Sequence, residues 1–175
     1  MSARQGRCTP VMQNNIPRQT MKQIPNELFF AWIEAEISEG HSVQLRLKGD
    51  SMYPLLRNGR DQVVLFPCNP DELRPMDVIL FRYNGKHFLH RILHIEGNRL
   101  YIQGDGSLVA KEECSKEDVI GKVHTIIRPS GKRISVKSLW WRIPSRLWRA
   151  TGIFRKYILR FLHHFIVQHP KKVHQ

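Results

Sequence analysis

A series of short segments between residues 42 and 136, separated by tight turns, most constrains the fold of this chain. Val43, Leu45 and Leu47 alternate with polar residues, which is typical of a half-buried strand. Asn84-Gly85 is a strong two-residue hairpin signal, and Gly97-Asn98 marks the next turn. The pattern predicts strands at 42–48, 61–67, 77–83, 87–96, 99–103, 119–127 and 132–136. We therefore expect a mainly β fold, a small coiled antiparallel sheet, rather than a βαβ unit.

Helical spacing occurs on either side of this β region. Leu28, Phe29, Trp32, Ile33 and Ile37 predict one short N-terminal helix over 26–39, which ends at Gly40. Near the other end, Ser145 is positioned to cap a long helix that runs to about Gln168. One stripe of that helix carries Leu147, Phe154, Ile158, Phe161 and Phe165, with Arg146, Arg149, Arg155, Lys156, Arg160 and His164 largely around it. The second prediction is thus a C-terminal basic amphipathic helix.

Charge is distributed unevenly along the chain. All 15 acidic residues lie at or before Asp118, where they are balanced by 15 Lys and Arg, and the other 13 basic residues follow. Together with the β region, this divides the chain into a disordered extension (1–20), a β domain (21–137) and a basic tail (138–175).

A basic amphipathic tail favours an anionic partner. Our first interpretation is an anionic membrane surface, bound through residues 138–168, with Trp140, Trp141 and Trp148 in the headgroup region. Packing of the tail on the body or on a partner protein is the main alternative, and nucleic acid is the least favoured.

The first 20 residues are polar and contain no apolar run typical of a secretory signal, and no segment approaches the ~20 apolar residues of a membrane span. This predicts a cytoplasmic protein, peripheral on the inner face of the plasma membrane. Cys8, Cys68 and Cys114 are scattered and show no ligand spacing with histidine, so we expect reduced thiols and neither a metal nor a cofactor.

The candidate chemistry centres on Ser51. Gly49 ends the first strand and Pro54 fixes a bend, so the serine is expected at the lip of the sheet. A serine hydroxyl needs a neighbouring base to become a nucleophile. His90 is the best candidate because it shares a strand face with apolar Phe88 and Ile92, where the neutral imidazole is favoured. The alternative interpretation is that His90 only fills a position in the sheet.

Five segments then follow one another in a recognisable order. They are Gly49-Asp50-Ser51-Met52-Tyr53-Pro54, Leu73 to Arg82, Leu89-His90-Arg91-Ile92, Gln103-Gly104-Asp105-Gly106 and Val119 to Val123. Across about residues 42–128 the chain resembles the signal peptidase I and SOS-repressor-like serine peptidases. The resemblance implies a coiled all-β peptidase domain with Ser51 as nucleophile.

The base that the resemblance implies depends on the branch. Bacterial signal peptidases and the repressors use a lysine, whereas the archaeal and endoplasmic-reticulum signal peptidases have a histidine followed by an arginine, as in His90-Arg91. Lys86 is offset from this position by four residues, in the hairpin turn. An exposed lysine there is protonated at neutral pH and cannot accept a proton.

The sequence offers more than one acidic residue that could orient the imidazole. Asp105 matches the Gly-Asp segment of the family and is the candidate for this role, although a turn residue between two glycines is an equal reading. The histidine branch usually has a further aspartate where this chain has Ala110 and Lys111, followed by Glu112. Asp105, Glu112 or a Ser–His dyad therefore all stay open.

The remaining site residues lie beside the serine. The backbone N–H groups of Ser51 and Asp50 are the candidate oxyanion donors, because Gly49 offers no hydroxyl. Met52 and Pro54 are expected to shape a substrate groove, or otherwise to pack the turn.

The leading functional hypothesis is a serine endopeptidase that cleaves a leader or signal-type peptide, with a peptide or protein as its substrate. The alternative is a catalytically silent, membrane-docked accessory module of the same fold. A self-cleaving regulator is a third hypothesis, disfavoured because residues 1–41 are short for a DNA-binding domain with its own core.

Overall fold

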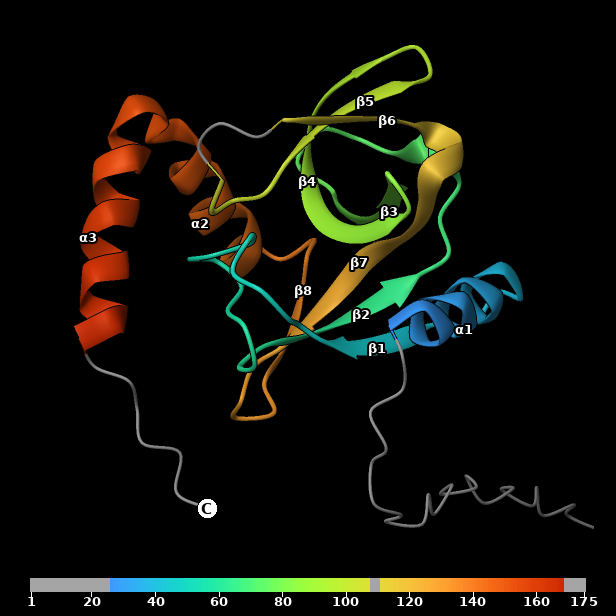
Figure 1. The fold of residues 1–175 in the computed structure, drawn as a ribbon, viewed down its shortest axis with the longest axis horizontal. Helices are drawn as coiled ribbons and strands as arrows, with labels where there is room; N and C mark the ends of the chain where they lie inside the picture. The colour runs from blue at the N-terminus through green and yellow to red at the C-terminus, as the bar shows by residue number, and fades with distance from the viewer. Residues whose placement is uncertain (1–25, 108–110, 169–175) are drawn as a thin grey trace, which may run out of the picture.

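The fold of the chain is given by a computed structural model. The structure describes residues 26–107 and 111–168, with side chains described up to Leu162 except at position 153. The predicted disordered extension (1–20) lies outside the described residues. Within them, the chain forms an antiparallel sheet of eight strands with one helix before it and helices after it (Figure 1). The predicted mainly β fold is confirmed.

Most expected elements occur close to their predicted positions. The structure contains α1 (Asn26–Ser38), β1 (Val43–Arg46), β2 (Gln62–Phe66), β3 (Val78–Tyr83), β4 (Lys86–Glu96), β5 (Arg99–Gln103), β6 (Glu112–Ser115), β7 (Val119–Ile127) and β8 (Arg133–Ser135). Short 3₁₀ turns lie at Pro70–Glu72, Lys116–Asp118 and Gly152–Phe154. Strand β6 was not predicted, because its sequence is polar and only Cys114 is buried.

The sheet is ordered β1-β2-β7-β3-β4-β5-β6, with β8 paired to β7, so β1 and β6 lie at the two ends of this order. Every pairing is antiparallel. Register shifts interrupt the β2–β7, β3–β7 and β4–β5 pairs, and irregularities of this kind increase the local twist of a sheet. The curl of the sheet is visible in Figure 1, where β4 bends strongly.

Two hydrophobic clusters fill the opposite faces of this curled sheet. Along β3, Val78 and Leu80 belong to one cluster, whereas Ile79 and Phe81 belong to the other. All four side chains are buried, because successive residues of a strand point to opposite faces and both faces are covered here. The first cluster also includes Ile33 of α1, so the N-terminal helix covers one face of the sheet.

The tail differs from its prediction. Instead of one helix capped by Ser145, it contains α2 (Leu139–Ala150) and α3 (Arg155–Gln168), separated by the 3₁₀ turn. Ser145 lies inside α2, one residue after Pro144, and is 1% exposed. Trp141 and Trp148 are also buried, so a headgroup position for these two tryptophans is wrong, whereas Trp140 is 80% exposed.

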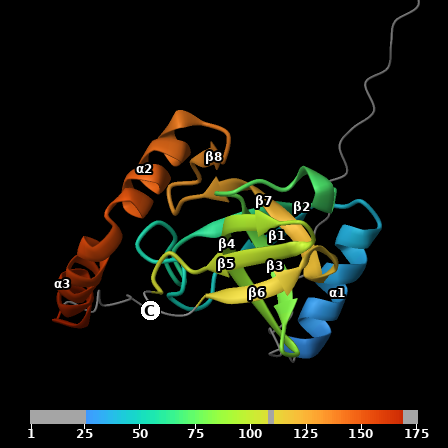
Figure 2. The same cartoon turned by 90° about the horizontal axis from the view of Figure 1, so that it is seen from above.

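Helix α2 therefore packs on the β domain rather than standing apart from it. Figures 1 and 2 show α2 and α3 at one end of the sheet and α1 at the other. In the described part of the chain, no helix combines the length and apolar character needed to cross a bilayer.

A core substitution on β3 tests this arrangement. Phe81→Ala removes a completely buried ring and should lower the free energy of unfolding by roughly 3–5 kcal/mol, measured by chemical denaturation. Phe66→Ala on β2 is the matched control, because Phe66 is 40% exposed, and it should cost distinctly less. If Phe81→Ala does not fold, Phe81→Leu serves in the same comparison. Equal losses at the two positions would contradict the core assignment.

Candidate active site

Ser51 lies in the connection between β1 and β2, in a turn that the local sequence shapes. Gly49 has φ +91°, a conformation that residues with a side chain rarely adopt. The Tyr53 N–H then donates to the Asp50 carbonyl oxygen over 3.0 Å, which closes the turn around the serine. Ser51 is exposed, as expected for a residue at the lip of the sheet.

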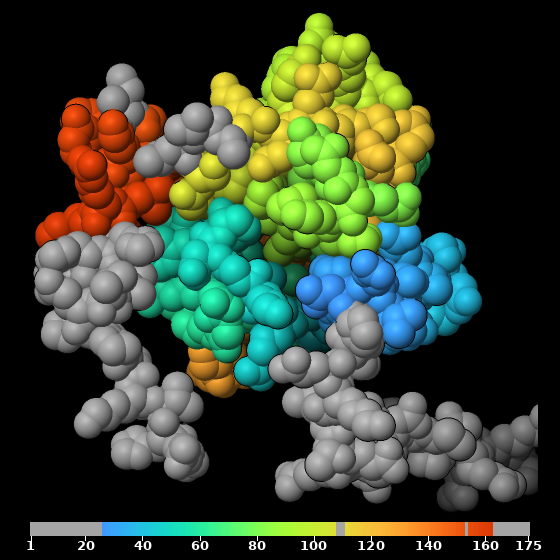
Figure 3. Space-filling model, in the orientation of Figure 1, coloured from blue at the N-terminus to red at the C-terminus, as the bar shows by residue number. Residues whose placement is uncertain are grey.

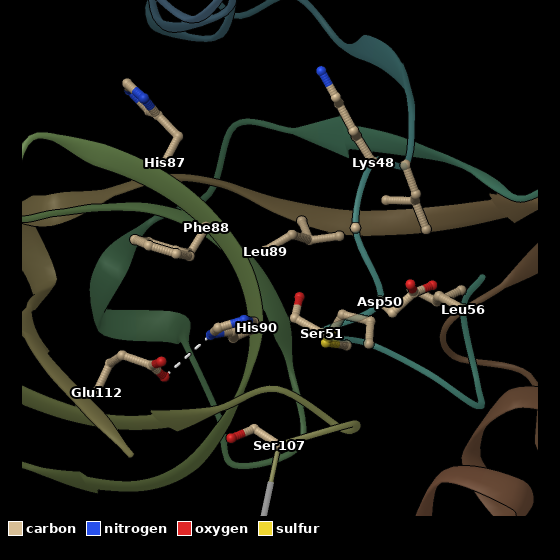
Figure 4. Close-up of a pocket in the computed structure, with 13 residues that line it drawn as sticks. Lys48, Asp50, Ser51, Leu56, His87, Phe88, Leu89, His90, Ser107 and Glu112 are labelled. Atoms are coloured by element: carbon tan, nitrogen blue, oxygen red, sulfur yellow. Dashed lines mark hydrogen bonds and ion pairs between the residues drawn. The ribbon is translucent and has the colours of Figure 1, made fainter. Parts of the chain in front are cut away.

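A cavity of about 430 Å³ opens beside this turn. Its lining includes Gly49 to Met52, Leu47, Lys48 and Leu56 from one side, His87 to His90 of β4 from another, and Ser107 and Glu112 from a third. Figure 4 shows Ser51 next to the ring of His90, with Glu112 beyond the other side of the ring. The expected nucleophile and base thus share one cavity.

His90 is nearly buried and has one bound and one unbound ring nitrogen. Its Nδ1 lies 3.1 Å from Oε2 of Glu112, the first residue of the edge strand β6. Its Nε2 is buried and makes no hydrogen bond to any described residue, including the hydroxyl of Ser51. Strand alternation also places the ring near Phe81 and Phe88, with ring centroids 6.0 and 5.6 Å away.

This environment sets the protonation state of His90. Burial lowers the pKa of His90 below its ordinary value, while the charge and hydrogen bond of Glu112, and more weakly Asp105, act in the opposite direction. Because burial dominates, the neutral imidazole is favoured at neutral pH. Nδ1 can donate to the Glu112 carboxylate in that form, which leaves Nε2 as the free acceptor.

Asp105 has a different partner from the one expected. Its two carboxylate oxygens accept hydrogen bonds from Arg91 Nε and a terminal guanidinium nitrogen, at 2.9 and 2.7 Å. Both side chains are almost completely buried. The prediction that Asp105 orients His90 is therefore corrected: its oxygens are occupied by Arg91, and Glu112 occupies the place beside the imidazole.

Arg91 and Asp105 form the centre of a buried polar cluster. A second guanidinium nitrogen of Arg91 donates to the Met76 carbonyl oxygen at 2.9 Å, and the guanidinium carbon lies 5.4 Å from the centre of the Trp141 ring. The Trp148 indole N–H donates to the Asp105 carbonyl oxygen at 3.0 Å. The charged pair thereby joins β4, the turn after β5 and helix α2.

The glycines on either side of Asp105 are required by close packing against the serine turn. A Cβ at Gly104 would collide with the Ser51 carbonyl oxygen and lie 3.1 Å from His90 Nε2. At Gly106 it would lie 2.6 Å from the Asp50 carbonyl oxygen. The Gly106 N–H donates to the Ser51 carbonyl oxygen at 2.8 Å, so this turn fixes the backbone of the serine.

The other predicted site residues divide between the cavity and the turn. Met52 is buried and lines the cavity, whereas Pro54 is half-buried and does not line it, so a groove-shaping role for Pro54 lacks support. The backbone N–H groups of Asp50 and Ser51 donate to no other described residue. No described residue therefore competes for these two donors. Lys86 is exposed at the start of β4, as expected, and does not line the cavity.

Glu112 is one of the acidic candidates from the sequence, but its position against His90 could not be derived there, because it begins a polar edge strand without an apolar alternation. Ala110, considered with it, lies outside the described residues. Within the described ranges, no group of three His, Cys, Asp or Glu side chains is arranged to hold a metal ion. Cys68 and Cys114 are free thiols.

The different partners of the two acidic residues lead to a stability prediction. Asp105→Asn leaves the Arg91 charge buried without its counter-ion and should lower the free energy of unfolding by about 3–5 kcal/mol. Glu112→Gln keeps a hydrogen-bond acceptor beside His90 and should cost less than about 2 kcal/mol. Urea denaturation of both variants makes the comparison. A larger loss for Glu112→Gln would contradict the structural role assigned to Asp105.

Comparison with known proteins agrees with this fold. A family model described as Peptidase S24-like matches residues 8–124, well over half of the chain. No curated protein matches the chain. The resemblance to signal peptidase I and SOS-repressor-like serine peptidases is thereby confirmed at the level of the superfamily. The chain belongs to the Peptidase S24-like family.

Proposed function

We propose that this protein is a serine endopeptidase in which Ser51 is the nucleophile, His90 the general base and Glu112 the residue that orients His90. One observation carries the proposal. His90 is held through Nδ1 by Glu112, its Nε2 has no hydrogen-bond partner among the described residues, and His90 and Ser51 line the same cavity. Nucleophile, base and orienting carboxylate are the components that serine peptidase chemistry needs.

In the proposed reaction, the Ser51 hydroxyl rotates toward Nε2 of His90 and transfers its proton there as Oγ attacks the substrate carbonyl carbon. The resulting imidazolium is stabilised by Glu112 through Nδ1. His90 then donates the proton to the leaving amine as the peptide C–N bond breaks. Water hydrolyses the acyl-enzyme by the same route, giving its proton to His90 and restoring the serine.

The negative charge on the tetrahedral intermediate needs donors that are already in place. The N–H groups of Ser51 and Asp50 suit this role because they have no other acceptor among the described residues. The Gly106 N–H supports them indirectly, since its hydrogen bond to the Ser51 carbonyl oxygen fixes the turn.

A leader or signal-type peptide is the proposed substrate class. Such peptides present short apolar side chains near the cleaved bond, and the cavity offers apolar Leu47, Met52 and Leu56 on the serine side and Leu89 on β4. The resemblance to signal peptidases motivates the same choice. We place the reaction at the cytoplasmic face of the membrane, where a leader peptide and its peptidase can meet.

A catalytically silent module of the same fold is the second candidate. It is favoured by one observation, the absence of a hydrogen bond between the Ser51 hydroxyl and His90 Nε2 in the described structure. Catalytic hydrogen bonds are often looser in empty active sites, so this geometry is also compatible with an active enzyme.

A fluorophosphonate probe distinguishes these candidates. An active enzyme should become labelled at Ser51, and Ser51→Ala should abolish labelling. His90→Ala should slow it by roughly 10²-fold or more, because the general base is lost. Ser42→Ala is the control, since Ser42 is an exposed serine outside the cavity, and it should label like the wild type. Folded wild-type protein that resists the probe would favour the silent module.

The pH dependence of labelling tests the base. Because burial lowers the pKa of His90, the labelling rate should rise with pH through a midpoint below 6.5, the ordinary value for histidine. Glu112→Gln removes the group that most raises this pKa. Its midpoint should therefore move further down, while the plateau rate falls at least about tenfold. A midpoint that moves up in Glu112→Gln would contradict the assigned roles.

The lowered pKa of His90 should also make the free energy of unfolding depend on pH. In the unfolded chain His90 binds a proton near pH 6.5, whereas in the folded protein it does so only at lower pH. Its stabilising contribution is therefore complete above pH 6.5 and is lost as the pH falls toward the folded pKa. This part of the pH dependence should disappear in His90→Gln when unfolding is measured from pH 7 downward.

A further inference from the structure

The tail helices carry a set of large apolar side chains that the β domain does not cover. Leu139, Trp140, Ile143 and Leu147 of α2 are between 52% and 80% exposed. Phe154, at the end of the 3₁₀ turn, and Tyr157, in the first turn of α3, are 72% and 62% exposed. We call these six residues the exposed apolar face of the tail.

On α2 this face is separate from the side that packs on the body. At about 100° per residue, Leu139, Trp140, Ile143 and Leu147 fall within roughly one third of the helix circumference. The buried Trp141, Ser145 and Trp148 fall on the opposite side. The helix is therefore apolar on two sides, and among the described residues only one of these sides is covered by the rest of the fold.

The charged side chains that residues 119–175 contribute around this face are all basic. Arg142 and Arg146 lie along one edge of it on α2, and both are exposed. Lys132 lies over the ring of Trp140, with Nζ 5.6 Å from the ring centre. Lys156 and Arg160 are exposed on α3, and residues 119–175 contain no acidic residue.

We propose that the exposed apolar face of the tail docks on the surface of an anionic lipid bilayer, with α2 lying in the headgroup region. An amphipathic helix with aromatic and aliphatic side chains on one face and basic residues beside it is typical of interfacial binding. The single sign of the charge complements anionic lipid, whereas docking of a second copy would bring like charges together. Nucleic acid would leave the apolar side chains exposed.

Docking would also orient the active-site cavity, because the tail is tied to the turn beside Ser51. Trp148 donates to the Asp105 carbonyl oxygen, and Arg149 and Arg155 both donate to the Gln103 side chain, at 3.0 and 3.1 Å. Arg155 also donates to the Ser107 carbonyl oxygen. In Figure 3, α3 lies at one side of the body, next to the segment that carries Ser51. A peptide anchored in the same bilayer would then approach the cavity from the lipid side.

Vesicle flotation of the full-length chain tests the docking. Wild-type protein should float with vesicles of phosphatidylglycerol and phosphatidylcholine, and should stay with the soluble fraction when the vesicles are pure phosphatidylcholine. Trp140→Ser/Leu147→Ser should lower the partition coefficient at least about tenfold. Arg142→Gln/Arg146→Gln should lower it by a similar factor, and added salt should weaken wild-type binding.

Matched variants elsewhere on the surface control for general effects. Trp32→Ser/Leu28→Ser removes a tryptophan and a leucine of comparable exposure (50% and 64%) from α1, and Arg46→Gln/Lys86→Gln removes two exposed cations from the β domain. Both should bind like the wild type, with folding checked by circular dichroism. Equal binding to pure phosphatidylcholine, or full binding by Trp140→Ser/Leu147→Ser, would overturn the proposal. So would a lipid-independent dimer that Trp140→Ser/Leu147→Ser dissociates.

Discussion

The buried ion pair between Arg91 and Asp105 is the interaction on which the arrangement of the site depends. Charges that are almost completely removed from water are tolerated only when they are paired and hydrogen-bonded, and both oxygens of Asp105 are used by Arg91. The pair fixes the Gly104–Gly106 turn against the serine turn and joins it to α2 through Trp148. Three segments far apart in sequence thereby meet around one cavity: the β1–β2 connection, β4 and the start of β6.

Much of the fold could be predicted from the sequence because its strands obey simple rules. The alternation in β1 and the Asn84-Gly85 turn predict the positions of β1, β3 and β4 to within a few residues. Burial of one face of a strand fixes both the period of its side chains and its register. The polar strand β6 could not be predicted, because it pairs at an edge and buries little apolar surface. The tail was predicted as one helix with three interfacial tryptophans. Burial of Trp141 and Trp148 depends on contacts with the distant Arg91–Asp105 cluster, which no local pattern reveals.

For the site, the sequence pointed to Ser51 and His90 as candidates, and in the structure both residues line one cavity. The acidic partner of His90 was harder to predict. The choice between Asp105 and Glu112 depends on which face of the sheet each of these carboxylates lies on. Arg91 follows His90 directly and so points to the opposite face, where it takes Asp105 as its partner. That leaves the His90 side open to Glu112 across the sheet edge.

The most direct test of this account is a crystal structure of the protein with a fluorophosphonate bound to Ser51. The account predicts a covalent bond from Ser51 Oγ to phosphorus, His90 Nε2 within ~3 Å of Oγ, and Nδ1 still on the Glu112 carboxylate. It also predicts that Asp105 stays bonded to Arg91. An adduct in which the imidazole has turned away from Oγ, or in which Asp105 has replaced Glu112 at Nδ1, would contradict it.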